Sequence, residues 1–266
     1  MKTVLVGRGR VGHGLHRLAR NGSGEWRLTS GHRPSRKLIA AADTVVLAVP
    51  DPVIGKVAAR IAPWLRKGAC VLHCAGSRTH DELEACARAG ARIGAMHPLA
   101  SFADPKRPPD LEGTFFISSG DKAAVTAARR VARAVGAKVL ALPLHGPTYH
   151  ALAAMIAGGT VGFVYATIPA LEDMGLDRRE AERAAGSLVR TVAENIMQIG
   201  LPKALTGPVI RGDSATVAAH RSSLGRLSKD VAAAYDAVAP LVLQCAIAAG
   251  LSEADTRRMR KVLRSG

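Results

Sequence analysis

A glycine-rich turn near the start of the chain limits the possible folds more than any other feature. Residues 2–6 form a short apolar, β-branched run, and Gly7-Arg8-Gly9-Arg10-Val11-Gly12 follows it directly. A helical pattern comes next, with Leu15 and Leu18 on one face and an end near Asn21-Gly22. A strand, a tight turn and a helix in this order are typical of the first unit of a doubly wound α/β domain.

Each of the three glycines has a separate role in such a turn. Gly7 permits the sharp change of direction, Gly9 lets the backbone approach a pyrophosphate, and Gly12 allows the helix to pack closely on the strand. The amide groups at the helix start then bind the anion. The alternative is an ordinary glycine-rich turn that binds nothing. We predict cofactor contacts at Gly7, Arg8, Gly9, Arg10, Val11 and Gly12.

The rest of the chain divides into two regions of different pattern. Short apolar runs alternate with helical segments up to Pro143, which predicts right-handed βαβ units and a mostly parallel sheet. Further strands are expected at 27–30, 44–49, 69–73, 92–95, 114–118 and 138–142. The remainder predicts only helices, at 147–174, 178–199, 214–225, 228–249 and 253–264. We therefore expect an α/β domain over 1–143 and an all-α domain over 144–266.

The end of the second expected strand indicates which dinucleotide would bind. An NAD site has Asp or Glu there, about 20 residues past the glycines, to bind the ribose hydroxyls. This chain instead has Ser30-Gly31-His32-Arg33-Pro34-Ser35-Arg36, without a carboxylate. Ser30, His32 and Arg33, together with Arg36, suit a 2′-phosphate, which favours NADP(H). The alternative is a solvated basic loop.

Residues that follow the later strands should border the same cofactor. Val49 and Pro50 would lie over it, and Asp51 is expected to cap the following helix. Ser77 and His97 end later strands, and Tyr149-His150 starts the long helix. We predict that His150, Tyr149 or His97 transfers a proton, and that Ser77 contacts substrate. Structural roles, with the histidines satisfied by local hydrogen bonds, remain the alternative.

The helical half contributes a polar loop, Leu205-Thr206-Gly207-Pro208-Val209-Ile210-Arg211-Gly212-Asp213. Arg211 could bind a substrate carboxylate bidentately, and Asp213 could pair with it or cap the next helix. Thr206 and His220 are further candidate substrate contacts, although a capping segment and a core histidine are the plainer interpretations. No group of His, Cys, Asp and Glu has metal-site spacing, so we expect no metal.

The composition indicates the cellular compartment and the class of binding partner. Lys and Arg outnumber Asp and Glu by 37 to 21, a net charge of +16 that favours anionic ligands. Four cysteines without a C-x-x-C pair, and an N-terminus unlike a signal peptide, favour a reducing cytoplasm. Few aromatic residues and no recognisable binding motif speak against nucleic acid.

Residues 151–171 carry no charge, but Gly158-Gly159 and Pro169 favour a helix buried at a domain or subunit interface over a membrane span.

These motifs together resemble a family of two-domain, Rossmann-like proteins with a helical C-terminal domain of formerly unassigned function, the DUF2520 type. The matching stretches are Gly7–Gly12, LAVPD at 47–51, MHPL at 96–99, YHALAA at 149–154, LTGPVIRGD at 205–213 and His220. The family is similar to pyrroline-carboxylate reductases, ketopantoate reductases, β-hydroxyacid dehydrogenases and imine reductases. The resemblance implies a nicotinamide-dependent oxidoreductase, often a homodimer through the helical domain.

The chain departs from the larger group at two catalytic positions. Its hydroxyacid and ketopantoate enzymes place Lys at the start of the long helix and Asn one or two turns later, whereas this chain has Tyr149-His150 and then Ala157-Gly158-Gly159. We expect an NADPH-dependent reductase of the C=O or C=N of a small acid, ketopantoate first and a cyclic imine second. The alternative from another class is a non-catalytic NADP(H)-binding sensor or scaffold.

Overall fold

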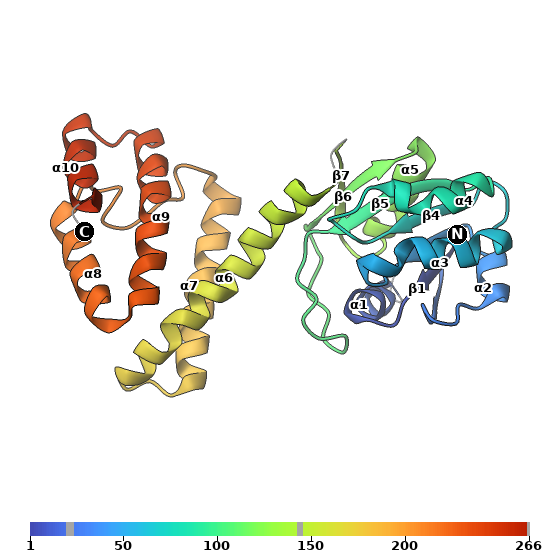
Figure 1. Cartoon of the computed structure of the whole chain (residues 1–266), viewed down its shortest axis with the longest axis horizontal. Coiled ribbons are helices and arrows are strands. Elements are labelled where there is room, and N and C mark those ends of the chain that lie inside the picture. The colour runs from blue at the N-terminus through green and yellow to red at the C-terminus, as the bar shows by residue number, and fades with distance from the viewer. Residues whose placement is uncertain (20–23, 143–145, 265–266) are drawn as a thin grey trace. The chain divides into compact units, whose positions relative to one another are not determined.

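The computed structural model describes residues 1–19, 24–142 and 146–264. It divides into two compact units, Met1–Ala157 and Gly158–Gly266, so the first turns of the long helix belong with the sheet. The expected helix end at Asn21-Gly22 and the end of the alternation at Pro143 lie outside the described residues. Figure 1 follows the chain through both units.

The first unit is built on one seven-stranded sheet. The strands are β1 (Lys2–Val6), β2 (Glu25–Thr29), β3 (Thr44–Leu47), β4 (Cys70–His73), β5 (Arg92–Pro98), β6 (Phe115–Gly120) and β7 (Lys138–Ala141). Their order is β2-β1-β3-β4-β5-β6-β7. Neighbours are parallel except β5 and β6, which pair antiparallel. The expected mostly parallel sheet is therefore confirmed.

Helices cover both faces of this sheet. They are α1 (Arg10–Ala19), α2 (Arg36–Ala40), α3 (Ile54–Ile61), α4 (Glu84–Arg88) and α5 (Lys122–Arg133), with 3-10 turns η1 (Asp51–Val53), η2 (Ala62–Trp64) and η3 (His80–Leu83). Val45 and Leu47 of β3 pack toward α3, whereas Val46 between them packs toward α1 and α5. Alternate side chains of one strand thus enter two cores, which makes the unit doubly wound.

The second part of the chain contains only helices in its described residues. They are α6 (Pro147–Asp173), α7 (Arg178–Ile199), α8 (Ser214–Leu227), α9 (Lys229–Ala248) and α10 (Glu253–Arg264), within a few residues of the expected bounds. Val217, Leu243 and Met259 form a small core of α8, α9 and α10. Arg221 of α8 reinforces it by pairing with Asp236, its Nε 2.7 Å from Oδ1. This confirms an all-α segment.

Helix α6 has few buried residues. Ile168 is the one that is buried among those described, and burial of the helix at a domain or subunit interface stays a prediction. Within the described residues, α6 and α9 are long and apolar enough to cross a membrane by length and composition alone, which is weak evidence for a span. Large apolar side chains of α6, Ile156 and Val161 among them, are exposed.

Candidate functional site

The carboxyl ends of β1 and β3 meet where the sheet changes its direction of winding. The chain runs from β1 to β2 on one side and then crosses to β3 on the other side of β1. Doubly wound sheets bind ligands at such a switch point, outside the carboxyl ends of the strands. The amides of Gly7 and Ala48 extend the pairing there, bonding to Thr29 and Val6 carbonyls at 2.9 and 2.8 Å.

The three glycines of the first turn occupy the environments expected from their spacing. Gly7 has φ +126°, and a Cβ on it would overlap the carbonyl oxygen of Ala48. A Cβ on Gly12 would overlap the carbonyl oxygen of Gly7, so the helix packs tightly on the turn. A Cβ on Gly9 would meet no atom within 4 Å. The backbone at Gly9 is therefore open to a ligand, beside the first amides of α1, which lack helical acceptors.

The loop after β2 has a hydrogen-bonded backbone and exposed basic side chains. Ser30 Oγ accepts hydrogen bonds from the amides of His32 (3.2 Å) and Arg33 (3.4 Å). Ser35 caps α2, and its amide donates to Thr29 Oγ1 at 3.0 Å. Arg60 of α3, which sequence reasoning missed, donates to the His32 carbonyl. Ser30 thus shapes the loop, while the side chains of His32 and Arg33 are exposed.

The segment after β3 lies beside the same turn. Val49 Cγ1 would be 3.3 Å from a Cβ on Gly7 and 2.7 Å from one on Gly31, so its side chain fills the space between the first two strand ends. Pro50 is exposed and precedes η1. The expected cap at Asp51 is wrong: Asp51 is the first residue of η1 and makes no cap, because its carboxylate accepts a hydrogen bond from Ser77 Oγ instead.

The predicted proton-transfer residues come together at the end of β5. His97 Nδ1 lies 2.8 Å from the hydroxyl of Tyr149, at the start of α6. The His97 ring centroid is 5.6 Å from those of both Tyr149 and His150, each in an edge-to-face arrangement. His150 Nδ1 is buried and has no hydrogen-bond partner among the described residues. The Nδ1 atom of His97 is thus paired, whereas the buried Nδ1 of His150 is not.

Burial shifts the pKa values of His97 and Tyr149 in this cluster. Desolvation, with a smaller contribution from His150, lowers the pKa of His97 to about 4. Desolvation raises the pKa of Tyr149 to about 12. At neutral pH His97 is therefore neutral and Tyr149 keeps its proton. Tyr149 donates this hydrogen bond to His97 Nδ1 in the tautomer that carries the imidazole proton on Nε2.

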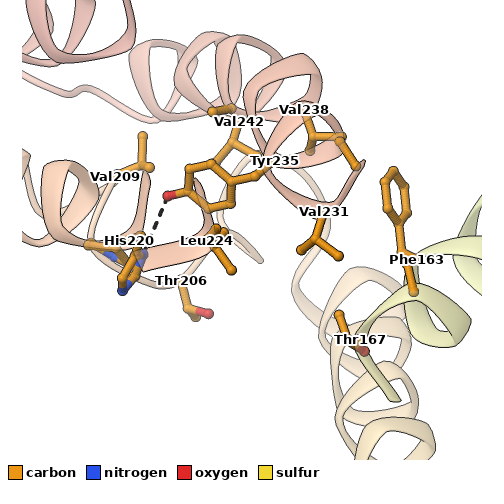
Figure 2. A pocket seen from close by; sticks show the side chains of 14 residues that line it. Phe163, Thr167, Thr206, Val209, His220, Leu224, Val231, Tyr235, Val238 and Val242 are labelled. Carbon is orange, nitrogen blue, oxygen red and sulfur yellow. Dashed lines mark hydrogen bonds between the residues drawn. The ribbon is translucent and has the colours of Figure 1, made fainter. Parts of the chain in front are cut away.

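The helical unit holds a separate pocket, shown in Figure 2. It has a volume of about 440 Å³ and apolar walls that include Phe163, Val231 and Val238. Two of the predicted substrate contacts, Thr206 and His220, are among the residues that line it. His220 Nδ1 faces the hydroxyl of Tyr235 at 3.4 Å, the dashed line in Figure 2. Tyr235 is a polar lining residue that sequence reasoning missed.

The other two predicted contacts of the polar loop have different positions. Arg211 is exposed and is not part of the pocket lining. Asp213 caps α8, accepting from the amide of Thr216 at 3.0 Å and from its hydroxyl at 2.6 Å. These bonds lower the pKa of the Asp213 carboxyl. Capping is thus the role that the structure assigns to Asp213, and no group of three or more metal-ligating side chains occurs in the described part of the chain.

Comparisons with known proteins agree with this architecture. Residues 114–241 match the family described as Domain of unknown function (DUF2520). None of the curated proteins is significantly similar in sequence. Among solved structures, protein TM1727 from Thermotoga maritima is 22% identical with a TM-score of 0.67, covering 93% of this chain and 99% of that one.

Two further structures extend the likeness. BF3122 from Bacteroides fragilis, proposed to be an NADP oxidoreductase, is 17% identical with a TM-score of 0.66, covering 91% of this chain and 97% of that one. Pyrroline carboxylate reductase from Plasmodium falciparum, solved with NADP bound, is 15% identical with a TM-score of 0.57 and 98% coverage of both chains. These neighbours share a sheet domain followed by helices. The chain thus has a Rossmann-like fold followed by helices, and its residues 114–241 match the DUF2520 family that its motifs resemble.

Proposed function

We propose that the protein is a nicotinamide-dependent oxidoreductase with NADP(H) as its preferred cofactor. The observation that carries this proposal is the turn at the switch point, where Gly7 and Gly12 are packed too closely for any side chain while Gly9 is open. A ligand that brings phosphate groups against bare backbone fits such a turn. The likeness to structures of NADP oxidoreductases supports the same cofactor class.

The loop after β2 supports a preference for NADP(H) over NAD(H). Residues 30–36 contain no carboxylate to accept ribose hydroxyls. They present His32 and Arg33 outward, with Arg36 at the start of α2 and Arg60 bonded to the loop backbone. A 2′-phosphate would find several cations at this position, and charge-assisted bonds to phosphate are strong.

The cluster at the end of β5 supplies the proton chemistry in this proposal. Bound nicotinamide supplies or accepts a hydride. Tyr149 holds a proton at its hydroxyl, directed at neutral His97, and His150 Nδ1 faces the same space without a partner. We infer that this group delivers a proton to the oxygen or nitrogen of a reduced C=O or C=N bond. A positioned acid contributes about 10²–10⁴-fold in rate.

The substrate in this proposal is a small acid with an apolar carbon frame, ketopantoate first and a cyclic imine acid second. The pocket in the helical unit supports an apolar frame, since hydroxyl and imidazole groups are scattered among mostly aliphatic walls. Thr206 and His220 would bind the polar end, and Arg211 is the proposed partner of the carboxylate. The protein would work in the cytoplasm without membrane or nucleic acid.

We further propose that the helical part associates with a second copy of the chain. Large apolar side chains are exposed along α6, with Ile156 71% and Val161 69% accessible. The same holds for α7, where Met197 is 78% accessible. Monomeric proteins seldom expose contiguous apolar surface on this scale, and symmetric dimers are the commonest way of covering it.

Turnover of NADPH tests the catalytic part of the proposal. The purified protein is given NADPH and a panel of 2-keto acids and cyclic imine acids, and loss of NADPH absorbance is followed. We expect turnover with at least one compound, and a loss of about 10²-fold in kcat for His150→Ala and Tyr149→Phe with NADPH affinity retained. Tight NADPH binding without turnover across the panel would favour the sensor or scaffold, a function consistent with Tyr149-His150 replacing the lysine of related enzymes.

A further inference from the structure

Gly76, in the loop after β4, lies against the rings of both His97 and His150. A Cβ on Gly76 would be 2.8 Å from His150 Nδ1 and 2.9 Å from both Nδ1 and Cε1 of His97. Carbon atoms in proteins do not approach ring atoms this closely, so a side chain here would displace one ring or both. The backbone of Gly76 is outside the left-handed region that favours glycine. Glycine is therefore needed here for space rather than for conformation.

The loop is held on both sides of Gly76. His73, fully buried at the end of β4, places its Nε2 2.9 Å from the carbonyl oxygen of Thr79 and its Nδ1 3.2 Å from the amide of Ala75. A carbonyl oxygen can only accept and a backbone amide only donates, so Nε2 of His73 donates and its Nδ1 accepts. Burial lowers the pKa of His73, which favours this neutral form. On the other side, Ser77 donates to the carboxylate of Asp51. These bonds leave Gly76 little freedom to move away from the rings.

We propose that His73 and Gly76 are positioning residues: His73 clamps the 75–79 loop, and the bare Gly76 forms the wall against which the His97 and His150 rings meet. The consequence is that His97 keeps its hydrogen bond to Tyr149 in a dry environment. The inference rests on the proposed function only for its meaning in catalysis, since the geometry stands without a substrate. Sequence reasoning placed Ser77 in this loop but gave no role to His73.

Several titratable groups face His97 and have to be considered together. Tyr149 and His150 approach from α6, Asp51 from η1 and His73 from β4. Asp51 favours the charged form of His97, while His150, His73 and desolvation disfavour it, and desolvation is the largest effect. A change that admits water to the cluster should therefore raise the pKa of His97 toward its ordinary value.

The test is a pH titration of protein labelled with ¹⁵N in its histidine rings, in which NMR reports the tautomer and the pKa of each ring. In the wild type we expect a neutral His97 with its proton on Nε2 above pH 5. In Gly76→Ala we expect the pKa of His97 to rise by about one unit or more, with the signature of the accepting Nδ1 weakened. Tyr149→Phe removes the donor directly and assigns that signature.

The matched control is Gly55→Ala. Gly55 lies in α3, and a Cβ there would make ordinary contact with Glu82 at 3.4 Å. The His97 titration should be unchanged in this variant. If the His97 pKa were also unchanged in Gly76→Ala, that result would overturn the role of Gly76, even if the variant lost stability. His73→Phe keeps an aromatic ring but has neither nitrogen. It should shift the pKa of His97 in the same direction as Gly76→Ala does. An unshifted His97 in folded His73→Phe would overturn the clamp, and if that variant fails to fold, Gly76→Ala decides alone.

Cofactor binding separates this inference from the proposed function. NADPH titrations of the same variants should give affinities within about threefold of wild type, because the glycine turn after β1 is untouched. Absence of NADPH binding in the wild type, with the predicted shifts of His97, would remove the proposed function and leave the positioning role. Tight NADPH binding, with no shift of the His97 pKa in the variants, would remove the positioning role and leave the proposed function.

Discussion

At the residue scale, glycine has two different roles: three glycines build the turn after β1, and Gly76 leaves space for the His97 and His150 rings. Gly7, Gly9 and Gly12 act within one local strand–turn–helix unit, so their roles follow from positions along the chain. Gly76 is required by two rings that arrive from β5 and α6, far away in sequence. The same limit applies to Asp51, whose carboxylate bonds to Ser77 rather than to its own helix. Contacts of this kind depend on tertiary packing.

The contrast between Gly7 and Gly9 predicts that substitution by alanine lowers stability at Gly7 and NADPH affinity at Gly9. Gly7→Ala places a side chain at φ +126° and against the Ala48 carbonyl, so we expect a loss of about 2 kcal/mol or more in the free energy of unfolding. Gly9→Ala meets no protein atom, so its stability should change by less than about 0.5 kcal/mol. Its NADPH affinity should nevertheless fall about tenfold, because the methyl group occupies space next to the bound phosphates. Urea unfolding and fluorescence titration measure the two quantities, and equal NADPH affinity for Gly9→Ala and wild type would contradict the assignment.

At the element scale, long helices with clear end signals were predicted well and short turns were not. The expected helices 178–199 and 253–264 coincide with α7 and α10. Helix α7 begins with a capping box, in which Asp177 accepts from the amides of Arg179 and Glu180. The region after β3 instead forms a 3-10 turn before α3, with Pro50 at its cap. A single proline-containing turn has too few residues for a period to define it.

The cap of α7 gives a prediction about this element alone. Asp177→Ala removes bonds of 2.8 and 3.0 Å to two amides that have no helical acceptor. We expect a loss of about 1 kcal/mol in the free energy of unfolding, seen as a lower urea midpoint with an unchanged slope. Asp177→Asn keeps an accepting oxygen and should retain most of the stability. Equal losses in both variants would mean that the charge of Asp177, rather than its capping bonds, stabilises the helix.

At the scale of the whole molecule, the two-part architecture could be predicted and the assembly could not. Alternating strands and helices, followed by helices alone, indicated the doubly wound sheet and the all-α segment. The uncharged stretch 151–171 indicated burial of α6 at a domain or subunit interface, which stays a prediction. A sequence shows that an apolar helix has to pack against another surface. Which surface this is depends on residues outside that helix.

Association of the helical part with a second copy of the chain predicts a dimer in solution. Light scattering after size exclusion should give twice the mass of the chain, and Val161→Glu should shift the protein toward monomer because it buries a charge in the proposed interface. Arg183→Glu, a charge change at an exposed position of α7, is the control and should remain dimeric. A wild-type monomer at micromolar concentration would contradict the proposed dimer, and extraction only with detergent would point to a membrane instead.

Cofactor binding is the central claim, and parallel titration with NADPH and NADH tests it most directly. Cofactor fluorescence is followed for the wild type and for Arg33→Ala, which removes one exposed cation from the loop after β2. We predict that NADPH binds at least about tenfold more tightly than NADH, and that Arg33→Ala weakens NADPH binding while leaving NADH binding unchanged. Failure of both dinucleotides to bind would contradict the account, because the open backbone at Gly9 would then have no ligand of the proposed class.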